Sequence, residues 1–561
     1  MKNNFYFLLV SALLVLLLSN NKIYSQVWDY LDIEPGYETL NLAIENDTLN
    51  GAPISMNRVY RLQRNGMYLY NGSIKNNFGA TIRIVANEGN GALPLIIPVA
   101  DQTGASRRFF LGSGDAYFEN LAISGVDNLG NVVAEGNMFR LNKAGMKLHI
   151  TGCFLDYDLQ SFIRMNAAGQ SVFVLNSLLR NSINPVSTGN GRFVDTRGLN
   201  QDTISFRNST CYVTGQNPIR STSSLINVLV FDHITFWGSN GINGGNNGVA
   251  TGTISKTTGV VQIQRAIDAQ VTNNLFIDCS FEDSRRYASN PDDTIKVPMI
   301  PIDSLRTDDP ALEGQRNWNI KNNVYGWSPA LNAWFSYTDS SYTPVFLNEH
   351  ADLMFSLYPT MKASNNVKEF VNFTDAPNPE TLVVFSMHKR ATNNSDVDNP
   401  VITADKNGKK SLEEDPASFG PAVNEFDFRY NTNSIAYTIA DGKPAGDLNP
   451  WGLEYIPTSI KEEFNNEIPT DFSLSQNYPN PFNPTTNIQY SLSSDSRVTL
   501  SVFNMLGQEV ARLIDNKDHS AGKYTVTWNA ATSSKSLASG IYIYQLKTDK
   551  ITISNKMILL K

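Results

Sequence analysis

Four arginines and one aspartate recur in phase within the first half of the chain, and their types and spacing are suited to binding acidic molecules. The segment MFRLNKAG at 138–145 recurs 24 residues later as FIRMNAAG at 162–169, which places Arg140 and Arg164 in equivalent positions. The next segments, FVDTRG and PIRS, contribute Asp195, Arg197 and Arg220. A stripe of guanidinium groups along one face of the protein is therefore expected.

Guanidinium groups bind carboxylates through two parallel hydrogen bonds, so a stripe of arginines suits an acidic polysaccharide. A structural alternative stays open at this level. The same arginines can pair with neighbouring carboxylates or bond to the carbonyl groups of loops, as structural ion pairs do in many proteins.

Composition restricts the class of protein that carries this stripe. Charged residues make up 17% of the chain and the net charge is −8, which argues against a nucleic-acid-binding surface. The chain contains 63 asparagines and 37 glycines, a composition that favours frequent turns over a helical bundle. Three cysteines are too few for a disulfide framework, and we expect them to be free, buried thiols.

A short repeat runs through the middle of the chain and supplies the elements that must position the arginines. Residues two and four before its centre, and three after it, are apolar in every copy, whereas the residue one before is mostly polar. This alternation predicts a strand with one buried face, followed by a tight bend and a second strand. The seven centres are Asn120, Gly152, Asn176, Asn208, His233, Asn273 and Asn322.

A unit of strand, bend, strand and variable loop cannot bury its own apolar face. Stacking successive units at the strand spacing of about 4.8 Å solves this, and it lets the asparagines bond to one another along the stack. The pattern therefore predicts a parallel β-helix. A β-sandwich of short strands is the alternative, but it does not account for an asparagine column that recurs in register.

On these residues, the chain from about residue 36 to 335 resembles the pectate-lyase-like superfamily of right-handed parallel β-helices. We expect the β-helix at 26–340 and an irregular closing segment at 341–456, whose end is similar to that of exported β-helix proteins. Tyr37, Leu40, Ala43 and Ile44 fall on one predicted helical face and resemble the family's N-terminal cap.

The resemblance also implies a chemistry. In these lyases an arginine or lysine removes the proton next to a uronate carboxylate, while calcium or basic side chains neutralise that carboxylate. Carried onto this chain, the resemblance implies Arg164 or Arg197 as the catalytic base, Arg140 and Arg220 as substrate-binding residues, and Asp195 as a calcium ligand. The chain lacks the clustered acidic triplet and the close Arg/His/Asn motifs of the better-defined lyase families.

The N-terminus carries a predicted address. Lys2 precedes an apolar run from Phe5 to Leu18, which is shorter than the roughly 20 residues needed to span a bilayer. We interpret residues 1–25 as a secretory signal peptide cut after Ser25, with an uncleaved anchor as the alternative. No later segment is long and apolar enough to span a membrane, so the mature chain is expected to have no transmembrane segment.

The C-terminus carries a second address. Residues 457–471 are polar and charged and predict a linker, and 472–561 contain alternating strands that predict a small antiparallel Ig-like sandwich. The motifs NYPNPFNP at 477–484, LGQEV at 506–510, SGIY at 539–542 and Lys556-Met557 closely resemble the type A C-terminal sorting domain of the type IX secretion system. That resemblance implies the secretion machinery as a partner and a location outside the cell or on the outer-membrane surface.

Two functional hypotheses follow from the sequence. In the first, the secreted β-helix binds an acidic polysaccharide along its arginines, or cleaves it by β-elimination. In the second, it is a non-catalytic adhesin or structural rod of the cell surface.

Overall fold

The chain folds into two units, a long parallel β-helix and a small antiparallel β domain. The β-helix lies within Asp29–Ile456 and the β domain within Pro457–Lys561. The predicted signal peptide at 1–25 and the linker at 457–471 lie outside the described residues, so the predicted domain boundaries stay predictions. The computed structural model describes residues 28–47, 57–76, 79–184, 190–215, 218–221, 224–239, 261–262, 265–280, 298–302, 305, 310–338, 344–347, 349–391, 426–456, 472–475, 477, 480, 482–519, 522–530 and 537–560.

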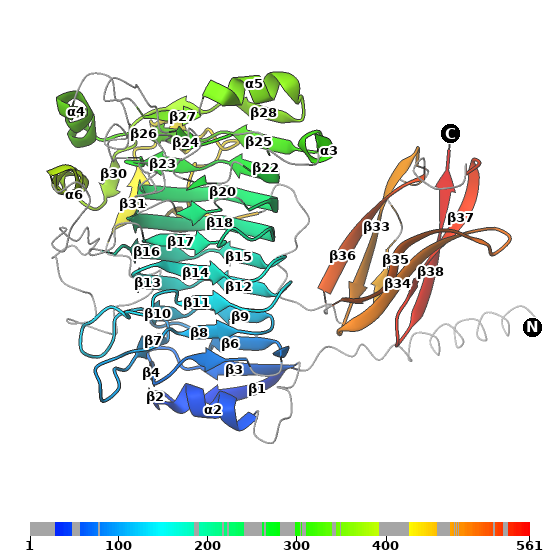
Figure 1. The fold of residues 1–561 in the computed structure, drawn as a ribbon, viewed down its shortest axis with the longest axis horizontal. Helices are drawn as coiled ribbons and strands as arrows, with labels where there is room; N and C mark the ends of the chain where they lie inside the picture. The colour runs from blue at the N-terminus through cyan, green and yellow to red at the C-terminus, as the bar shows by residue number, and fades with distance from the viewer. Residues whose placement is uncertain are drawn as a thin grey trace, which may run out of the picture. The chain divides into compact units, whose positions relative to one another are not determined.

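The turns of the β-helix stack in parallel, and the turns in the middle of the stack contribute strands to three faces (Figure 1). The first two faces form one 20-stranded sheet over the described residues, because the chain bends between them without leaving the sheet. The first face contains β1 (Asp29–Ile33), β3 (Arg58–Leu62), β6 (Ile82–Ala86), β9 (Ala116–Glu119), β12 (Lys147–Thr151), β15 (Ser171–Leu175), β18 (Gln201–Thr214), β20 (Ile226–Ser239), β22 (Ala266–Thr272), β25 (Asn317–Lys321) and β28 (Met361–Ser364).

The second face follows the bend in each turn. The strands β18 and β20 run through the bend and belong to both faces. Its other strands are β2 (Gly36–Tyr37), β4 (Met67–Tyr70), β7 (Leu95–Pro98), β10 (Ala122–Ser124), β13 (Phe154–Asp158), β16 (Leu178–Ser182), β23 (Leu275–Ile277), β26 (Val324–Gly326) and β29 (Val367–Lys368).

The third face is a separate 7-stranded sheet over the described residues. Its strands are β5 (Ile74–Lys75), β8 (Phe110–Gly112), β11 (Phe139–Leu141), β14 (Ser161–Met165), β17 (Arg192–Asp195), β19 (Ile219–Arg220) and β21 (Val261–Gln262). A short parallel pair, β24 (Pro298–Ile300) and β27 (Val345–Leu347), lies further along the chain.

The apolar columns predicted from the repeat are the core of this stack. In register, Leu148 pairs with Val172 and Ile150 with Val174 on the first face, while Leu155 pairs with Leu179 on the second. All of the predicted core positions are buried, apart from a partly buried residue at the last copy, Tyr325. The parallel β-helix prediction is therefore confirmed, and the sandwich alternative is wrong for this unit.

The bend between the first two faces needs a backbone conformation that few residues adopt. All seven predicted centres have positive φ, between 44° at Asn208 and 62° at Gly152. Asparagine and glycine tolerate this left-handed region best, which explains why they fill the column. Asn365, with φ of 53°, is an eighth centre that the repeat analysis missed.

The asparagine side chains bond to one another along the stack, as predicted. The Nδ2 of Asn208 donates to Oδ1 of Asn176 at 2.6 Å. Further along, Asn322 donates to Asn273 at 3.1 Å and Asn365 donates to Asn322 at 2.7 Å. The ladder is interrupted at His233, whose Nδ1 instead lies 3.1 Å from Oδ1 of the neighbouring Asp232.

At the N-terminal end, the helix α2 (Thr39–Asp47) covers the first turn, packing on β1 and β4 (Figure 1). Leu40 and Ile44 are buried and Ala43 packs against the core, as the sequence predicted. Tyr37 was wrongly included, because it lies in β2 before the helix begins and is 51% exposed.

The C-terminal part of the β-helix unit is less regular. Its described residues include the α-helices α3 (Pro310–Glu313), α4 (Pro329–Thr338), α5 (Glu349–Leu357) and α6 (Glu380–Ala391). The sheet itself continues through β28 and β29, so the segment from 341 onward contributes a further turn of the stack.

Residues 426–456 are the described end of the segment predicted at 341–456, and they alone are called the closing segment from here on. They return to the middle of the stack. They contain β31 (Asp427–Tyr430), which pairs with β30 (Phe373–Asp375), and the short 3₁₀ helices η7 (Ile435–Tyr437) and η8 (Asn449–Trp451). Leu448 donates its N–H to Oδ1 of Asn208 beside the ladder interruption, and Asp447 accepts from the Thr210 hydroxyl at 2.7 Å. Tyr455 donates to Asp232 at 2.7 Å. The closing segment therefore uses the polar groups that the interrupted ladder leaves available.

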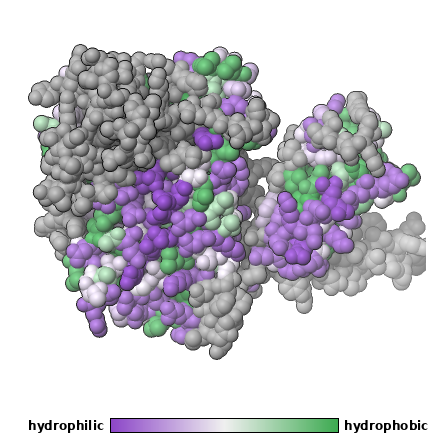
Figure 2. All heavy atoms as spheres, in the orientation of Figure 1, coloured by the Kyte–Doolittle hydropathy of each residue, from purple (hydrophilic) through white to green (hydrophobic). Residues whose placement is uncertain are grey.

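Apolar side chains concentrate in the interior and polar ones cover the surface. Figure 2 shows that the described part of one face of the β-helix is mainly hydrophilic, with scattered apolar residues. Cys153, Cys211 and Cys279 are free and buried, as predicted. Burial raises the pKa of the Cys153 thiol to about 12, so it remains protonated and unreactive.

The C-terminal unit is the predicted small β domain. A 3-stranded sheet and a 4-stranded sheet, both antiparallel, enclose a second hydrophobic core over the described residues. The strands are β32 (Ser473–Leu474), β33 (Thr485–Leu492), β34 (Ser496–Asn504), β35 (Glu509–His519), β36 (Gly522–Asn529), β37 (Gly540–Lys547) and β38 (Thr552–Leu559).

Substituting a ladder asparagine should separate its two contributions to stability. Asn322→Ala leaves its partners Asn273 and Asn365 without their bonds and keeps a Cβ at positive φ, so unfolding should become easier by roughly 2–4 kcal/mol. Asn322→Gly removes the bonds but tolerates the backbone conformation, so its loss should be smaller. Urea unfolding of both variants measures the difference, and equal losses would contradict a role for the backbone conformation.

Buried aspartates should make the β-helix less stable as the pH rises from about 4 to 7. Burial raises the pKa of Asp447 to about 7 and those of Asp158 and Asp278 to about 6, above the unfolded value of about 3.9. The folded state then binds more protons than the unfolded state, and this stabilisation is lost through the folded pKa values. Thermal unfolding across this range should show the decline, and Asp447→Asn should make it shallower; an unchanged slope would contradict this assignment.

Candidate functional site

The predicted arginine stripe exists on the third face. β-pairing places Arg140 opposite Arg164, Arg164 opposite Asp195, and Asp195 opposite Arg220. These four residues, named the arginine column, therefore occupy the same position on four successive turns. The buried neighbours of Arg140 and Arg164 along each strand face the core, which directs the column outward.

Arg197 lies beside the column, two residues after Asp195. Its backbone has φ of 57°, and its N–H donates to Oδ1 of Asp195 at 3.0 Å. The Arg197 side chain is 46% exposed, with Nη1 at 4.0 Å from Oδ2 of Asp195. The structure thus brings all five predicted site residues together.

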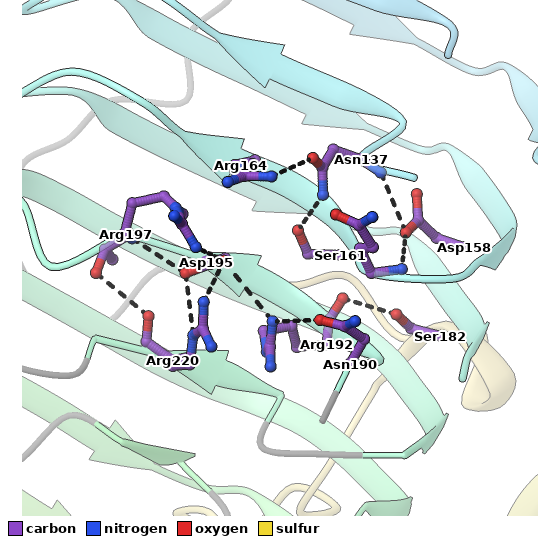
Figure 3. Close-up of polar contacts among 12 residues, drawn as sticks. Asn137, Asp158, Ser161, Arg164, Ser182, Asn190, Arg192, Asp195, Arg197 and Arg220 are labelled. Carbon is purple, nitrogen blue, oxygen red and sulfur yellow. Dashed lines mark hydrogen bonds and ion pairs between the residues drawn. The ribbon is translucent and has the colours of Figure 1, made fainter. Parts of the chain in front are cut away.

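Asp195 is the counter-ion of one end of the site (Figure 3). Arg220 binds it through two hydrogen bonds, at 3.2 and 2.7 Å, and the buried Arg192 lies 3.7 Å away. Burial by itself raises the pKa of Asp195, but Arg220 and Arg192 outweigh it and hold that pKa below its usual value. Asp195 is therefore ionised, and it neutralises part of the charge that surrounds it.

The other end of the site has no such counter-ion. Among the described residues, no carboxylate lies within ion-pair distance of Arg140 or Arg164. Both guanidinium groups instead donate to one neutral acceptor, Oδ1 of Asn137, at 3.2 Å from Arg140 and 3.1 Å from Arg164. In both arginines the Nε atom is buried and makes no hydrogen bond. Figure 3 shows Asn137 between Arg164 and Asp158, the last residue of β13.

The pKa shifts of Arg140 and Arg164 are consistent with the lack of a counter-ion at this end of the site. The pKa of Arg140 is lowered by burial and then by the nearby positive charges of Arg108 and Arg164. The pKa of Arg164 is lowered by burial and by Arg197, against an opposing attraction from Asp195. A guanidinium keeps its charge under these conditions. Burial is the first cause of both lowered pKa values, and the neighbouring cations add a positive potential that Glu135 and Asp195 offset only in part.

A structural arginine elsewhere in the chain provides the contrast. Arg180, on the second face, is buried and donates to the equally buried Asp156 at 2.8 Å. At this position a buried arginine has a buried carboxylate partner, as expected of a structural ion pair. The structural alternative consequently fits Arg192 and Arg220, but it leaves Arg140 and Arg164 unexplained.

The arrangement favours anion binding over the catalytic and calcium roles that the family resemblance implied. Three guanidinium groups surround Asp195, and a divalent cation placed there would meet their repulsion. Among the described residues, no group of three or more His, Cys, Asp or Glu side chains gathers to hold a metal ion. Arg164 and Arg197 remain positively charged, which suits them to binding carboxylates more than to accepting a proton.

Sequence reasoning missed three contributors to this site, Asn137, Arg192 and Arg108. Asn137 stands 24 residues before Ser161, the same spacing that relates Arg140 to Arg164, and its Nδ2 donates to the Ser161 hydroxyl at 3.0 Å. Extending the repeat by one residue toward the N-terminus would have found that pair. Its contacts with the arginines depend on the loop before β11, which the repeat does not predict.

Comparison with protein families concerns the C-terminal unit, which folds as the sequence motifs predicted. Residues 476–560 match the secretion system C-terminal sorting domain. This sorting domain indicates export by the type IX secretion system, with the secretion machinery as partner, to the cell surface or the extracellular space. Comparison with curated proteins gives no match to the chain.

Within the described part of the chain, no helix combines the length and apolar character that crossing a membrane requires. The signal peptide itself stays a prediction, because residues 1–25 are not among those described.

Asp195 can be tested as a structural counter-ion. Asp195→Asn should make unfolding easier by roughly 3 kcal/mol, because it leaves the buried Arg192 without its carboxylate. A chelator should leave the melting temperature of the parent protein unchanged. A marked decrease on chelation, restored by calcium, would contradict this interpretation and support the calcium ligand that the family resemblance implied.

Proposed function

We propose that the exported β-helix binds an acidic polysaccharide along the third face, through Arg140, Arg164 and Arg197. The observation that carries the proposal is the absence, among the described residues, of any carboxylate paired with Arg140 or Arg164. Both arginines lie on consecutive turns with their strands in register. An extended polyanion is the ligand class whose repeated charges match cations repeated along a stack.

The spacing of the stack supports this ligand class. Consecutive turns are about 4.8 Å apart, so neighbouring guanidinium groups can engage one acidic group together or successive groups along a chain. Arg220 is held by Asp195 and is less available, so it contributes to the frame of the site more than to binding. The sorting domain, which indicates export, supports a ligand found outside the cell.

We do not include cleavage by β-elimination in the proposal; it is one possible outcome of the experiment below. The site supplies cations that would stabilise a carbanion-like transition state, but none of its predicted members is a neutral base. Binding without cleavage is therefore what the geometry supports best. The rod or adhesin hypothesis differs in requiring no anion site at all.

Removing either arginine should weaken binding to polygalacturonate. Arg140→Ala and Arg164→Ala should each raise the dissociation constant by roughly tenfold, the loss expected for one charge-assisted hydrogen bond. The matched control is Arg429→Ala on β31, which removes an exposed arginine paired with Asp427. Isothermal titration calorimetry measures the constants, and absorbance of an unsaturated product detects cleavage.

Parent-like affinity of both arginine variants would contradict the proposal and favour the rod or adhesin. Binding that survives high salt would contradict it as well, because partly exposed charge interactions weaken as ionic strength rises. An unsaturated product from the parent protein, lost in Arg164→Ala or Arg197→Ala, would add the lyase activity that the family resemblance implies.

A further inference from the structure

Among the described residues, the Asn137 side chain hydrogen-bonds to both arginines that lack a carboxylate partner. Its Oδ1 accepts from Arg140 and from Arg164, two residues on different turns of the stack. Asn137 is itself buried, with φ of 62°, in the loop between β10 and β11. A single amide oxygen thus fixes the separation of two like charges.

The loop that carries Asn137 is held from two sides. The Asp158 carboxylate accepts the N–H groups of Asn137 and Met138, at 3.2 and 2.8 Å. Arg108 donates to the carbonyl of Gly136 at 2.9 Å and pairs with Glu135 at 3.1 Å. The position of the amide oxygen is therefore set by the fold and does not depend on the arginines it contacts.

The acceptor is neutral, and this is the feature that matters for binding. An aspartate in the same place would make the same two hydrogen bonds and would also cancel one positive charge. A carboxylate adds to these hydrogen bonds a Coulomb attraction that an amide oxygen lacks, so an aspartate would hold the arginines more firmly and compete with any ligand anion. An asparagine orients the guanidinium groups without neutralising their positive charge.

We propose that Asn137 is a positioning residue of the glycan site, which holds Arg140 and Arg164 at the spacing of adjacent turns while preserving their charge for an anionic ligand. The inference rests on the proposed function, because it assigns the arginines to ligand binding. It adds a requirement that the proposed function lacks: the acceptor between the two arginines has to be uncharged.

The test compares three variants in titrations with polygalacturonate, with methyl-esterified polygalacturonate as the neutral control polymer. Asn137→Asp should weaken binding by at least roughly tenfold, because it neutralises the pair of arginines. Asn137→Gly keeps the positive φ but releases both guanidinium groups, so its loss should be smaller, roughly threefold. Asn128→Asp is the matched control, since Asn128 is exposed and its Oδ1 accepts the N–H of Ala100; its affinity should stay within roughly twofold of the parent's.

A thermal unfolding measurement separates positioning from a merely structural role. Asn137→Asp should unfold within about 2 °C of the parent or above it, because two guanidinium groups compensate the new carboxylate. The proposal expects affinity to fall without a fall in stability. Parent-like affinity in Asn137→Asp, or in Asn137→Gly should the aspartate variant not fold, would overturn it, as would an equal loss in Asn128→Asp.

The two proposals fail separately. If Arg140→Ala and Arg164→Ala bind polygalacturonate as the parent does, the proposed function is wrong and Asn137 has no ligand site to position. If both arginine variants lose affinity but Asn137→Asp keeps it, the glycan site stands and the role of Asn137 is wrong.

Discussion

The structure depends on one repeated constraint: in each turn of the β-helix the chain bends at the same point into a left-handed conformation. That bend keeps every strand in register with the strands of the turns before and after it. Because the register is kept, a residue close to the bend meets its equivalent on the next turn. On the third face β-pairing keeps the column aligned although the number of residues before the bend changes from 12 at Arg164 to 13 at Asp195. Core columns, the asparagine ladder and the arginine column are all consequences of the same register.

Register also has an electrostatic cost. At the spacing of adjacent turns, two positive charges near a protein surface repel by on the order of 3 kcal/mol. Two arrangements offset this repulsion along the column. Asp195 neutralises Arg220 and Arg192. Asn137 instead holds Arg140 and Arg164 through a neutral oxygen. The second arrangement is the less favourable for stability and the more favourable for binding an anion.

Most of the β-helix and of the sorting domain could be predicted from the sequence, because both depend on patterns within short segments. The bend residues, the core columns and the equivalence of Arg140 with Arg164 follow from short repeats, and the motifs of the sorting domain are contiguous. Contacts between distant segments were not predictable in this way. Leu448 of the closing segment donates to Asn208, which is 240 residues earlier in the sequence, and no local sequence pattern predicts that contact. Asn137 reaches Arg164 through a loop conformation fixed by Asp158, and Tyr37 precedes its helix by two residues.

Binding of an acidic polysaccharide by Arg140 and Arg164 is measured most directly by NMR of the arginine side-chain Nε–Hε signals during titration with polygalacturonate. Assignment would use the Arg140→Lys and Arg164→Lys spectra. We expect the signals of Arg140 and Arg164 to shift with added polymer while that of the buried Arg180 stays in place. Shifts confined to other arginines, or none at saturating polymer, would contradict it.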